Sequence, residues 1–344
     1  MLAPKIHRIR VEKFRRISDV IELDLRTPRG RPSPLVVLAG PNGCGKTSVL
    51  EAVLLGLGQE ALILRDLEPS EREASWRASV PEGARIELTI STDAWTEETW
   101  VRTREGFSRV KGDGTKDELD PGSSLPRELL LVEYFSSWRA PKLVGPVKAG
   151  APGRRPLPSE ANRLWRLKQR IADEFTRVGV QRSLRGPAQS KPETWMEQLN
   201  RAWRRFHRND GTTIAPELVE PGGEEGLFVD LVVKRGDERI CSVDQISSGE
   251  IEVLVFAQWV ILNDVQAGLL VIDEPELHLH PSWQATILPA LRELAPGLQL
   301  LVATHSDAIW DQASERFLLV DESDPRSQAW RKAHVLPGDE EAVS

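Results

Sequence analysis

The feature that most constrains how this chain can fold is a short apolar run that leads straight into a glycine-rich turn. The run is Leu35–Ala39, and residues 40–47 after it match the pattern G-x-x-x-x-G-K-[ST]. A helical pattern continues from Lys46, so the sequence predicts a strand, a loop and a helix in direct succession. Glycines in such a loop let backbone N–H groups close around phosphate oxygens, and the helix N-terminus adds partial positive charge. We therefore expect the loop to bind a nucleoside triphosphate, in preference to a glycine-rich turn with an incidental lysine.

The residue types in this loop also predict how ATP and Mg²⁺ would be held. Lys46 would reach the β- and γ-phosphates, and the hydroxyl of Thr47 would be a ligand of Mg²⁺. The predicted nucleotide-binding residues of the loop are Gly40, Pro41, Asn42, Gly43, Cys44, Gly45, Lys46, Thr47 and Ser48.

The composition limits the other kinds of protein that this chain can be. Its 344 residues are enough for one large or two ordinary domains with a substantial core. No apolar run is as long as the roughly 18 residues of a membrane span, and no apolar signal block opens the chain, so we expect a cytoplasmic protein without membrane contact. Two cysteines, Cys44 and Cys241, suit a reducing compartment and give no metal-ligand spacing. A net charge of −7 argues against nucleic-acid binding over the whole surface.

Strand and helix patterns alternate along the chain and predict an α/β fold with a mostly parallel sheet covered on both faces. Strands are predicted at residues 5–14, 20–25, 35–39, 85–90, 98–103, 128–135, 227–233, 239–243, 268–272, 298–303 and 316–320, with a further short strand at 334–336. Helices are predicted at 251–262 and 281–294, and residues 112–124 are predicted to be a loop.

The middle of the chain changes to a helical period and becomes basic. Apolar residues recur at spacings of three and four after Ser159 and again after Pro192, which predicts two helices. Residues 154–208 hold 14 Lys and Arg against 5 Asp and Glu, a local charge of +9 that leaves −16 for the rest. This region would either meet a phosphate backbone or be a solvated helix face whose tryptophans pack inward, and the pattern leaves both open. The arginines predicted to contact nucleic acid are Arg201, Arg204 and Arg205.

Two polar clusters follow buried strands, at the strand ends where parallel sheets bind ligands. Asp273 and Glu274 come directly after residues 268–272, and His305 follows residues 298–303. Asp273 would hold Mg²⁺, and Glu274 would be the general base that deprotonates the attacking water. His305 would hydrogen-bond the γ-phosphate or that water. The predicted catalytic residues are Lys46, Glu274 and His305, and the predicted metal ligands are Thr47 and Asp273.

A neighbouring cluster of Glu276, His278 and His280 has the donor types of a metal site. These donors lie on one short segment and lack a third imidazole. A metal site at this segment is therefore the weaker interpretation.

The motifs together resemble those of the ABC-type ATPases. Four segments carry the resemblance in the family's order: residues 40–47, 246–250, 269–275 and 304–306. The form D-E-P-E-L-H-L-H-P at residues 273–281 looks like the OLD/RecF/SMC-related branch, and V-E-K-F-R-R-I at residues 11–17 is similar to that branch's "NF+xI" start. The resemblance covers about residues 1–135 and 225–320, and no recognised motif covers the basic middle.

This resemblance implies a P-loop NTPase of the ABC-ATPase type, with an N-terminal antiparallel β-subdomain and a small basic helical lobe beside the central sheet. Residues 1–150 would be the N-terminal part of the ATPase domain and 151–212 the basic lobe. Residues 213–337 would be the C-terminal part, and 338–344 an acidic tail.

The family also implies a composite site in a head-to-tail homodimer that forms on ATP binding. Ser248 and Gly249 of the signature would contact the γ-phosphate of nucleotide bound at Lys46 of a second copy. The signature departs from the usual LSGGQ in having Ser248 for the first Gly and Glu250 for Gln. Arg139 stands near the place of the family's Q-loop glutamine and is predicted to sense phosphate or nucleotide instead. The signature residues predicted to bind nucleotide are Ser247, Ser248, Gly249 and Glu250.

As a function, the resemblance implies ATP hydrolysis that acts as a switch or motor on DNA or on a partner effector such as a nuclease, in DNA repair or anti-phage defence. Only 39 residues follow His305, too few for the Toprim nuclease domain of OLD enzymes, so we expect any nuclease to be a separate protein. Two alternatives stay open. One is a scaffold that assembles on ATP without hydrolysing it, and the other, which fits the signature less well, is the ATPase subunit of a transporter.

Because Cys44 lies inside the phosphate loop, alkylation of its thiol should block nucleotide binding. We expect saturating ATP to protect the thiol, measured by maleimide labelling together with a nucleotide-binding assay. Full labelling under saturating ATP, with binding unimpaired, would rule this expectation out.

Overall fold

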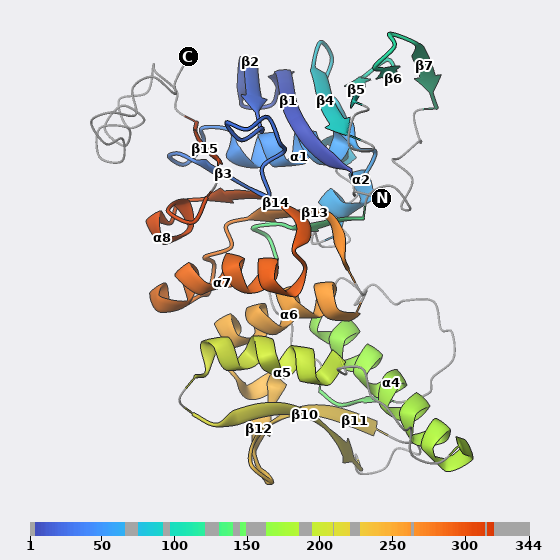
Figure 1. Ribbon diagram of the computed structural model, residues 1–344, viewed down its shortest axis with the longest axis vertical. Helices are drawn as coiled ribbons and strands as arrows, with labels where there is room; N and C mark the ends of the chain where they lie inside the picture. Colours follow the sequence, from blue (N-terminus) through green and yellow to red (C-terminus); the bar gives the residue numbers. More distant parts are fainter. Residues whose placement is uncertain are drawn as a thin grey trace. The chain divides into compact units, whose positions relative to one another are not determined.

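The computed structural model describes residues 4–65, 75–91, 97–120, 131–139, 145–148, 163–185, 195–208, 210–220, 228–262, 265–313 and 315–319. The chain forms two compact units, whose elements are labelled in Figure 1. The first unit holds Met1–Arg139, Gln266–Leu277 and Pro296–Ser344, and the second holds Ala140–Val265 and His278–Ala295. No described helix is long and apolar enough to cross a membrane.

A parallel sheet in the first unit carries the predicted strand-end motifs. Its strand order is β15-β3-β14-β13-β8, and every neighbouring pair is parallel. The strands are β3 (Leu35–Ala39), β8 (Val132–Phe135), β13 (Ala267–Asp273), β14 (Gly297–Thr304) and β15 (Glu315–Leu318). The three central strands are almost wholly buried, as expected for apolar runs that are covered on both faces. The predicted α/β fold with a parallel central sheet is confirmed.

An antiparallel sheet forms the rest of the first unit, with strand order β2-β1-β4-β5-β6-β7. Its strands are β1 (Lys5–Phe14), β2 (Ile17–Asp24), β4 (Arg85–Ser91), β5 (Glu97–Thr103), β6 (Phe107–Lys111) and β7 (Lys116–Leu119). Helix α1 (Lys46–Gly56) contacts β1 and β4 of this sheet and β13 and β14 of the parallel sheet (Figure 1). α1 is buried on nearly every side, and its apolar side chains pack in one hydrophobic core with residues of both sheets. Short helical turns follow at α2 (Glu60–Leu64), η1 (Ser75–Ala78) and α8 (Asp307–Trp310).

The prediction of a loop over residues 112–124 is wrong for residues 116–119, which form β7. β7 lies inside that range and pairs with β6, and Lys111 N–H donates to the carbonyl of Thr115 across the turn. Gly114 has a φ of +84°, a conformation that favours glycine. The glycines therefore close a hairpin, and the charged residues of β7 suit its place at the sheet edge.

The second unit is built on a smaller antiparallel sheet. The order is β10-β11-β12, and β9 also pairs with β11. Its strands are β9 (Val147–Lys148), β10 (Thr212–Val219), β11 (Phe228–Arg235) and β12 (Glu238–Ser242), with the turn η3 (Val243–Gln245) after them. β10 was not predicted because Pro216 interrupts its pattern, and such a proline is tolerated in an edge strand.

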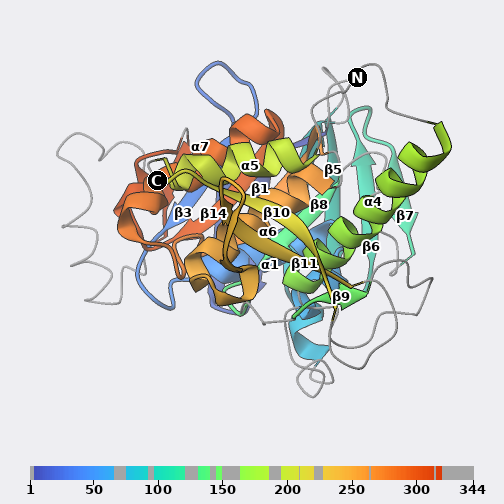
Figure 2. The same ribbon diagram turned by 90° about the horizontal axis from the view of Figure 1, so that it is seen from below.

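Four helices complete the second unit: α4 (Arg163–Arg185), α5 (Trp195–Phe206), α6 (Ser248–Leu262) and α7 (Pro281–Leu294). α5 packs on β10, α6 and α7, and α4 packs on β9 and β11 (Figure 2). The two middle helices are confirmed, and they lie in the same compact unit as the signature helix α6. The apolar face of α5, with Leu199, Trp203 and Phe206, is buried.

Some predicted features fall outside the described residues. They are the helix start at Ser159, residues 128–130 of a predicted strand, Val320, the strand at 334–336 and the tail at 338–344.

A buried ion cluster ties α4 to the rest of the second unit. Nζ of Lys168 lies 2.8 Å from a carboxylate oxygen of Asp230 and 3.1 Å from the carbonyl of Gly145, and it also contacts the carboxylate of Asp244. The Lys168 side chain is fully buried, so it does not belong to the basic surface in which the sequence count placed it. A buried ammonium needs such close anions to offset the water it has lost.

Replacing Lys168 by Ala should lower the free energy of unfolding of the second unit by about 3–5 kcal/mol, because Asp230 would stay buried without its nearest cation. Hydrogen exchange of the α4 and β11 amides measures the change. Arg170→Ala, an exposed position on the same helix, is the control and should change stability by less than about 0.5 kcal/mol. Equal effects of the two substitutions would contradict a stabilising ion cluster.

Candidate nucleotide-binding and hydrolysis site

The phosphate-loop sequence folds as a turn between β3 and α1. Gly40, Gly43 and Gly45 have φ values of +153°, +87° and +101°, where a side chain is strained. A Cβ on Gly40 would also lie 2.2 Å from the carbonyl oxygen of Leu319, so that position has no room for a side chain. Gly45 is the N-cap of α1, and the helix N-terminus faces the loop. The predicted strand, loop and helix are therefore present in the predicted order.

Lys46 closes this loop on itself. Its Nζ donates to the carbonyl oxygens of Gly40, at 2.8 Å, and Pro41, at 3.1 Å, and the side chain is buried. Burial lowers the pKa of Lys46, and the carboxylates of Asp273 and Glu274 act in the opposite direction. A phosphate bound in the loop would offer this ammonium a charged acceptor in place of neutral carbonyls.

Cys44 lies in the same loop and is partly buried. Burial raises the pKa of its thiol, although the nearby Lys46 lowers it in part. The thiol is therefore mostly protonated at neutral pH, and alkylation of Cys44 should be slow without being prevented.

The strongest indication of a metal site is the buried carboxylate of Asp273. Its Oδ2 accepts a hydrogen bond from the hydroxyl of Thr47 at 2.8 Å, and Asp273 is only 1% exposed. Its Oδ1 is buried and has no hydrogen-bond partner among the described residues. Burial raises the pKa of Asp273, although the hydroxyls of Thr47 and Ser137 lower it in part, so a bound cation would favour the ionised form. A hydroxyl and a carboxylate are oxygen donors that fit Mg²⁺, and Thr47 and Asp273 are the residues that would hold it.

Glu274 and His305 lie together beyond the ends of β13 and β14. Nε2 of His305 is 3.5 Å from Oε1 of Glu274, and both side chains are about one-third exposed. The contact with His305 is the main cause that lowers the pKa of Glu274, so this carboxylate is ionised at neutral pH. Glu274 has a φ of +52°, and its N–H donates to the carbonyl of Ala303 at 2.8 Å. A charged, accessible carboxylate next to an imidazole can accept a proton from water.

Glu276 fixes residues 304–305 at the end of β14, a role that was not predicted from the sequence. Its Oε1 accepts from the hydroxyl of Thr304 at 2.8 Å and from the N–H of His305 at 2.6 Å. The described residues contain no group of three or more His, Cys, Asp or Glu that could hold a metal, so the alternative metal site finds no support there. The sequence signal for this role was the second carboxylate of D-E-P-E at residues 273–276, where Pro275 separates Glu276 from Glu274.

Arg139 is buried, and its side chain hydrogen-bonds to the backbone at the end of β13. Its guanidinium donates to the carbonyls of Asp273 at 2.6 Å, Glu274 at 2.7 Å and Ser136 at 2.8 Å. These bonds position the two acidic residues. Its predicted contact with phosphate or nucleotide stays a prediction.

The opening of the chain, where the "NF+xI" resemblance begins, packs against the phosphate-loop helix. Arg15 forms an ion pair with the buried Glu51 of α1. The side chain of Ile17 lies 3.6 Å from where a Cβ on Gly45 would be. The β1–β2 hairpin therefore supports the loop from one side.

The signature residues lie in the second unit, at the start of α6. Ser247 and Glu250 form a capping box, in which Oε2 of Glu250 accepts from the N–H of Ser247 at 2.8 Å and the Ser247 hydroxyl accepts from the N–H of Glu250 at 3.3 Å. The spacing S-x-x-E was the sequence signal for this cap. Gly249 is required because a Cβ there would lie 2.5 Å from the carbonyl oxygen of His278.

The predicted nucleic-acid surface on α5 is present only in part. Arg201 and Arg204 are exposed, whereas Arg205 forms an ion pair with Glu293 of α7. Trp203 is buried and donates from its ring nitrogen to the hydroxyl of Thr212 at 2.9 Å. The inward-packing interpretation therefore holds for Trp203.

The chain matches two families over separate parts. The family described as "AAA domain, putative AbiEii toxin, Type IV TA system" matches residues 153–311, and the family described as "AAA domain" matches residues 8–117. Both matches include segments that carry the resemblance to ABC-type ATPases.

Two named relatives share parts of this sequence. The chain is 34% identical over 107 residues to the Retron Vc95 probable ATPase of Vibrio cholerae serotype O1 biovar El Tor. The matched region covers 28% of this chain and 20% of that protein. It is 21% identical over 330 residues to Septu protein PtuA of Bacillus mycoides (strain KBAB4). Here the matched region covers 88% of this chain and 38% of that protein. The chain thus spans a fifth to two-fifths of the length of these relatives.

The fold is also that of a solved protein class. A crystal structure of the SmcHead bound to the C-winged helix domain of ScpA aligns with a TM-score of 0.53 and 15% identity, over 90% of this chain and 91% of that chain. At this identity the likeness is one of fold. Together with the family matches it confirms the resemblance to ABC-type ATPases of the OLD/RecF/SMC-related branch.

Replacing Glu276 by Ala should lower the rate of ATP hydrolysis by up to about 100-fold and leave ATP affinity little changed, because His305 would lose the acceptor that fixes its backbone. Steady-state kinetics and nucleotide titration measure the two effects. Glu276→Gln keeps an acceptor oxygen and is the matched control, with most of the activity retained. Equal losses for both variants would show that Glu276 does more than position residues 304–305.

Proposed function

We propose that this chain binds and hydrolyses ATP as an ABC-type ATPase that dimerises around ATP and acts as a switch or motor on DNA or on a separate effector protein. The observation that carries the proposal is the buried carboxylate of Asp273, hydrogen-bonded to Thr47 and left with one oxygen that has no partner among the described residues. Glu274 and His305 stand beside it with a proton-accepting geometry.

In this proposal each strand end contributes one function. The loop after β3 binds the triphosphate through its backbone N–H groups and Lys46. Thr47 and Asp273 hold Mg²⁺, which supplies charge stabilisation of the phosphate oxygens when bound. Glu274 takes the proton of the attacking water, and His305 keeps that carboxylate ionised and oriented.

The second half of the site would come from another copy of the chain. Ser247 and Ser248 are exposed at the N-terminus of α6, where a helix offers N–H groups and partial positive charge to an anion. The resemblance to ABC-type ATPases suggests that Ser248 and Gly249 complete the site around the γ-phosphate bound by a second copy. Hydrolysis would then depend on assembly.

The relatives suggest where such an ATPase acts. Their names connect them to retrons and to Septu, and we propose a role in anti-phage defence with a separate effector, such as a nuclease, as the partner. Arg201 and Arg204 on α5 offer exposed positive charge for nucleic acid. DNA binding is the part of this proposal that rests on that surface alone.

The test compares wild type with Lys46→Ala, Glu274→Gln and the exposed control Glu118→Gln, in ATP binding and in turnover at several protein concentrations. Lys46→Ala should lose ATP binding, because the phosphates lose their cation. Glu274→Gln should keep binding and lose at least about 100-fold in turnover, because the amide cannot take a proton. The control should match wild type.

A specific activity that rises with protein concentration supports the composite site. Equal, near-zero turnover in wild type and Glu274→Gln, with ATP still bound, would favour the scaffold that assembles without hydrolysis. Unchanged ATP affinity in Lys46→Ala would contradict nucleotide binding at this loop.

A further inference from the structure

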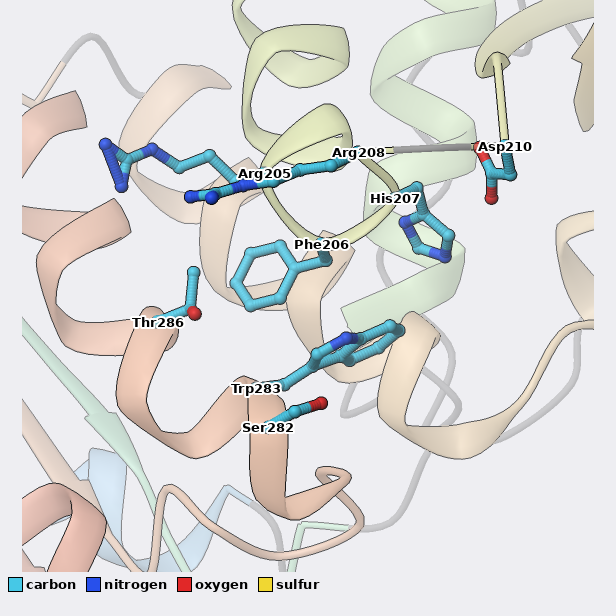
Figure 3. A pocket seen from close by; sticks show the side chains of 8 residues that line it. All are labelled: Arg205, Phe206, His207, Arg208, Asp210, Ser282, Trp283 and Thr286. Carbon is cyan, nitrogen blue, oxygen red and sulfur yellow. The ribbon is translucent and has the colours of Figure 1, made fainter.

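His207 connects the basic helix α5 to the signature motif within the second unit. It follows directly after α5, and its Nε2 lies 2.9 Å from Oε1 of Glu250. Its ring stacks on Trp203, with centroids 3.7 Å apart and planes 11° apart, and meets Trp283 of α7 edge-on at 5.1 Å. Figure 3 shows His207 above Trp283, at one wall of a pocket between the ends of α5 and α7. The imidazole is thus fixed by two aromatic rings and one carboxylate.

Both ring nitrogens of His207 face oxygen acceptors. Nδ1 lies 3.2 Å from the carbonyl oxygen of Trp203, and Nε2 faces the carboxylate of Glu250. A carbonyl oxygen and an ionised carboxylate can only accept, so both contacts are hydrogen bonds only when both nitrogens carry a proton. The ring that satisfies this geometry is the imidazolium, with a positive charge next to Glu250.

Glu250 uses its other oxygen to organise the signature. Oε2 accepts from the N–H of Ser247 at 2.8 Å and from its hydroxyl at 2.7 Å. The hydrogen bond from His207 is the main cause that lowers the pKa of Glu250 to about 2, so this carboxylate stays ionised at every ordinary pH. A full negative charge therefore stands at the N-terminus of α6, in the segment that would meet a phosphate.

An uncompensated carboxylate at this place would repel the phosphate that the helix N-terminus attracts. The usual signature has a neutral glutamine where this chain has Glu250. We propose that His207 is a positioning residue of the signature: as the imidazolium it holds Glu250 in the capping box and cancels its charge, so that α6 can accept the nucleotide of a second copy. This role rests on the proposed ATP-dependent dimer. In that dimer, His207 is the residue that allows the signature to have Glu250 in place of glutamine.

The test is a double-mutant cycle of His207→Ala and Glu250→Gln in the Glu274→Gln background, with MgATP and sedimentation velocity as the measure of dimer formation. With Glu250 present, His207→Ala should weaken the dimer by about tenfold or more, because a charged hydrogen bond is lost and the carboxylate stays. With Gln at position 250, His207→Ala should change the dimer by less than about threefold. Equal weakening in both backgrounds, or none in the first, would overturn the proposal and leave His207 as packing for Trp203 alone.

The pH dependence gives a second readout that packing would not produce. Glu250 remains ionised, and its contact with His207 needs a proton on the imidazole, so the dimer of the Glu274→Gln protein should weaken as pH rises. Glu250→Gln should remove that slope. The other charged groups around the pair are Asp210, Arg205 and Arg208, which line the same pocket, and Cys241, which lies near Glu250. They are unchanged across the cycle, so a slope that persists in Glu250→Gln belongs to them and contradicts the proposal.

A measurement on the single chain separates this inference from the proposed function. Nitrogen NMR of His207 without nucleotide should show both ring nitrogens protonated in wild type, and a changed Nε2 signal in Glu250→Gln, where the charged acceptor is absent. Identical spectra of the two proteins would overturn the pair. If no variant dimerises with MgATP while the spectra differ as expected, the dimer is wrong and the charge compensation stands.

Discussion

The hydrogen bond between Thr47 and Asp273 joins segments 226 residues apart, and much of the first unit serves to place it. β14 lies between β3 and β13, and its parallel register aligns Thr304 with Ala39 and Ala303 with Asp273. Three strands therefore end at one edge, and each end carries one part of the site. A buried carboxylate with an unmatched oxygen is costly by itself. A bound cation would offset this cost. We therefore infer that the site binds a metal ion together with an anionic ligand.

The opposite ends of the same strands show how the two sheets are held together. Gln299 near the start of β14 is buried, and its amide accepts from the N–H of Ile6 at 2.8 Å and donates to the carbonyls of Ile6 at 2.9 Å and Ser33 at 3.1 Å. One side chain thus satisfies backbone groups of β1 and of the segment before β3. The two sheets are therefore also joined at the end of β14 that lies away from the site.

The strands and loops that carry the site could be predicted because each is a local pattern. β3 and α7 have the predicted bounds and α1 begins at the predicted residue, since an apolar run, an N-terminal proline and a glycine-rich turn mark them. The hairpin of β6 and β7 and the edge strand β10 could not, because charged residues and Pro216 hide their period. The contacts of Glu276 and His207 were out of reach for a different reason. They join residues 29 and 43 positions apart, and no spacing within one element records such a pair.

The signature loop illustrates what those distant contacts achieve. Three segments meet it within the second unit: Lys168 of α4 pairs with Asp244 just before it, His207 after α5 pairs with Glu250, and the carbonyl of His278 lies against Gly249. Each contact uses a different interaction: a buried ion cluster, a partly buried charge pair and a steric fit. A movement of α4 or α5 would therefore change the charge or the position of the loop without breaking its capping box. α5 also carries the exposed Arg201 and Arg204, and His207, which hydrogen-bonds to Glu250 of the signature, follows directly after this helix.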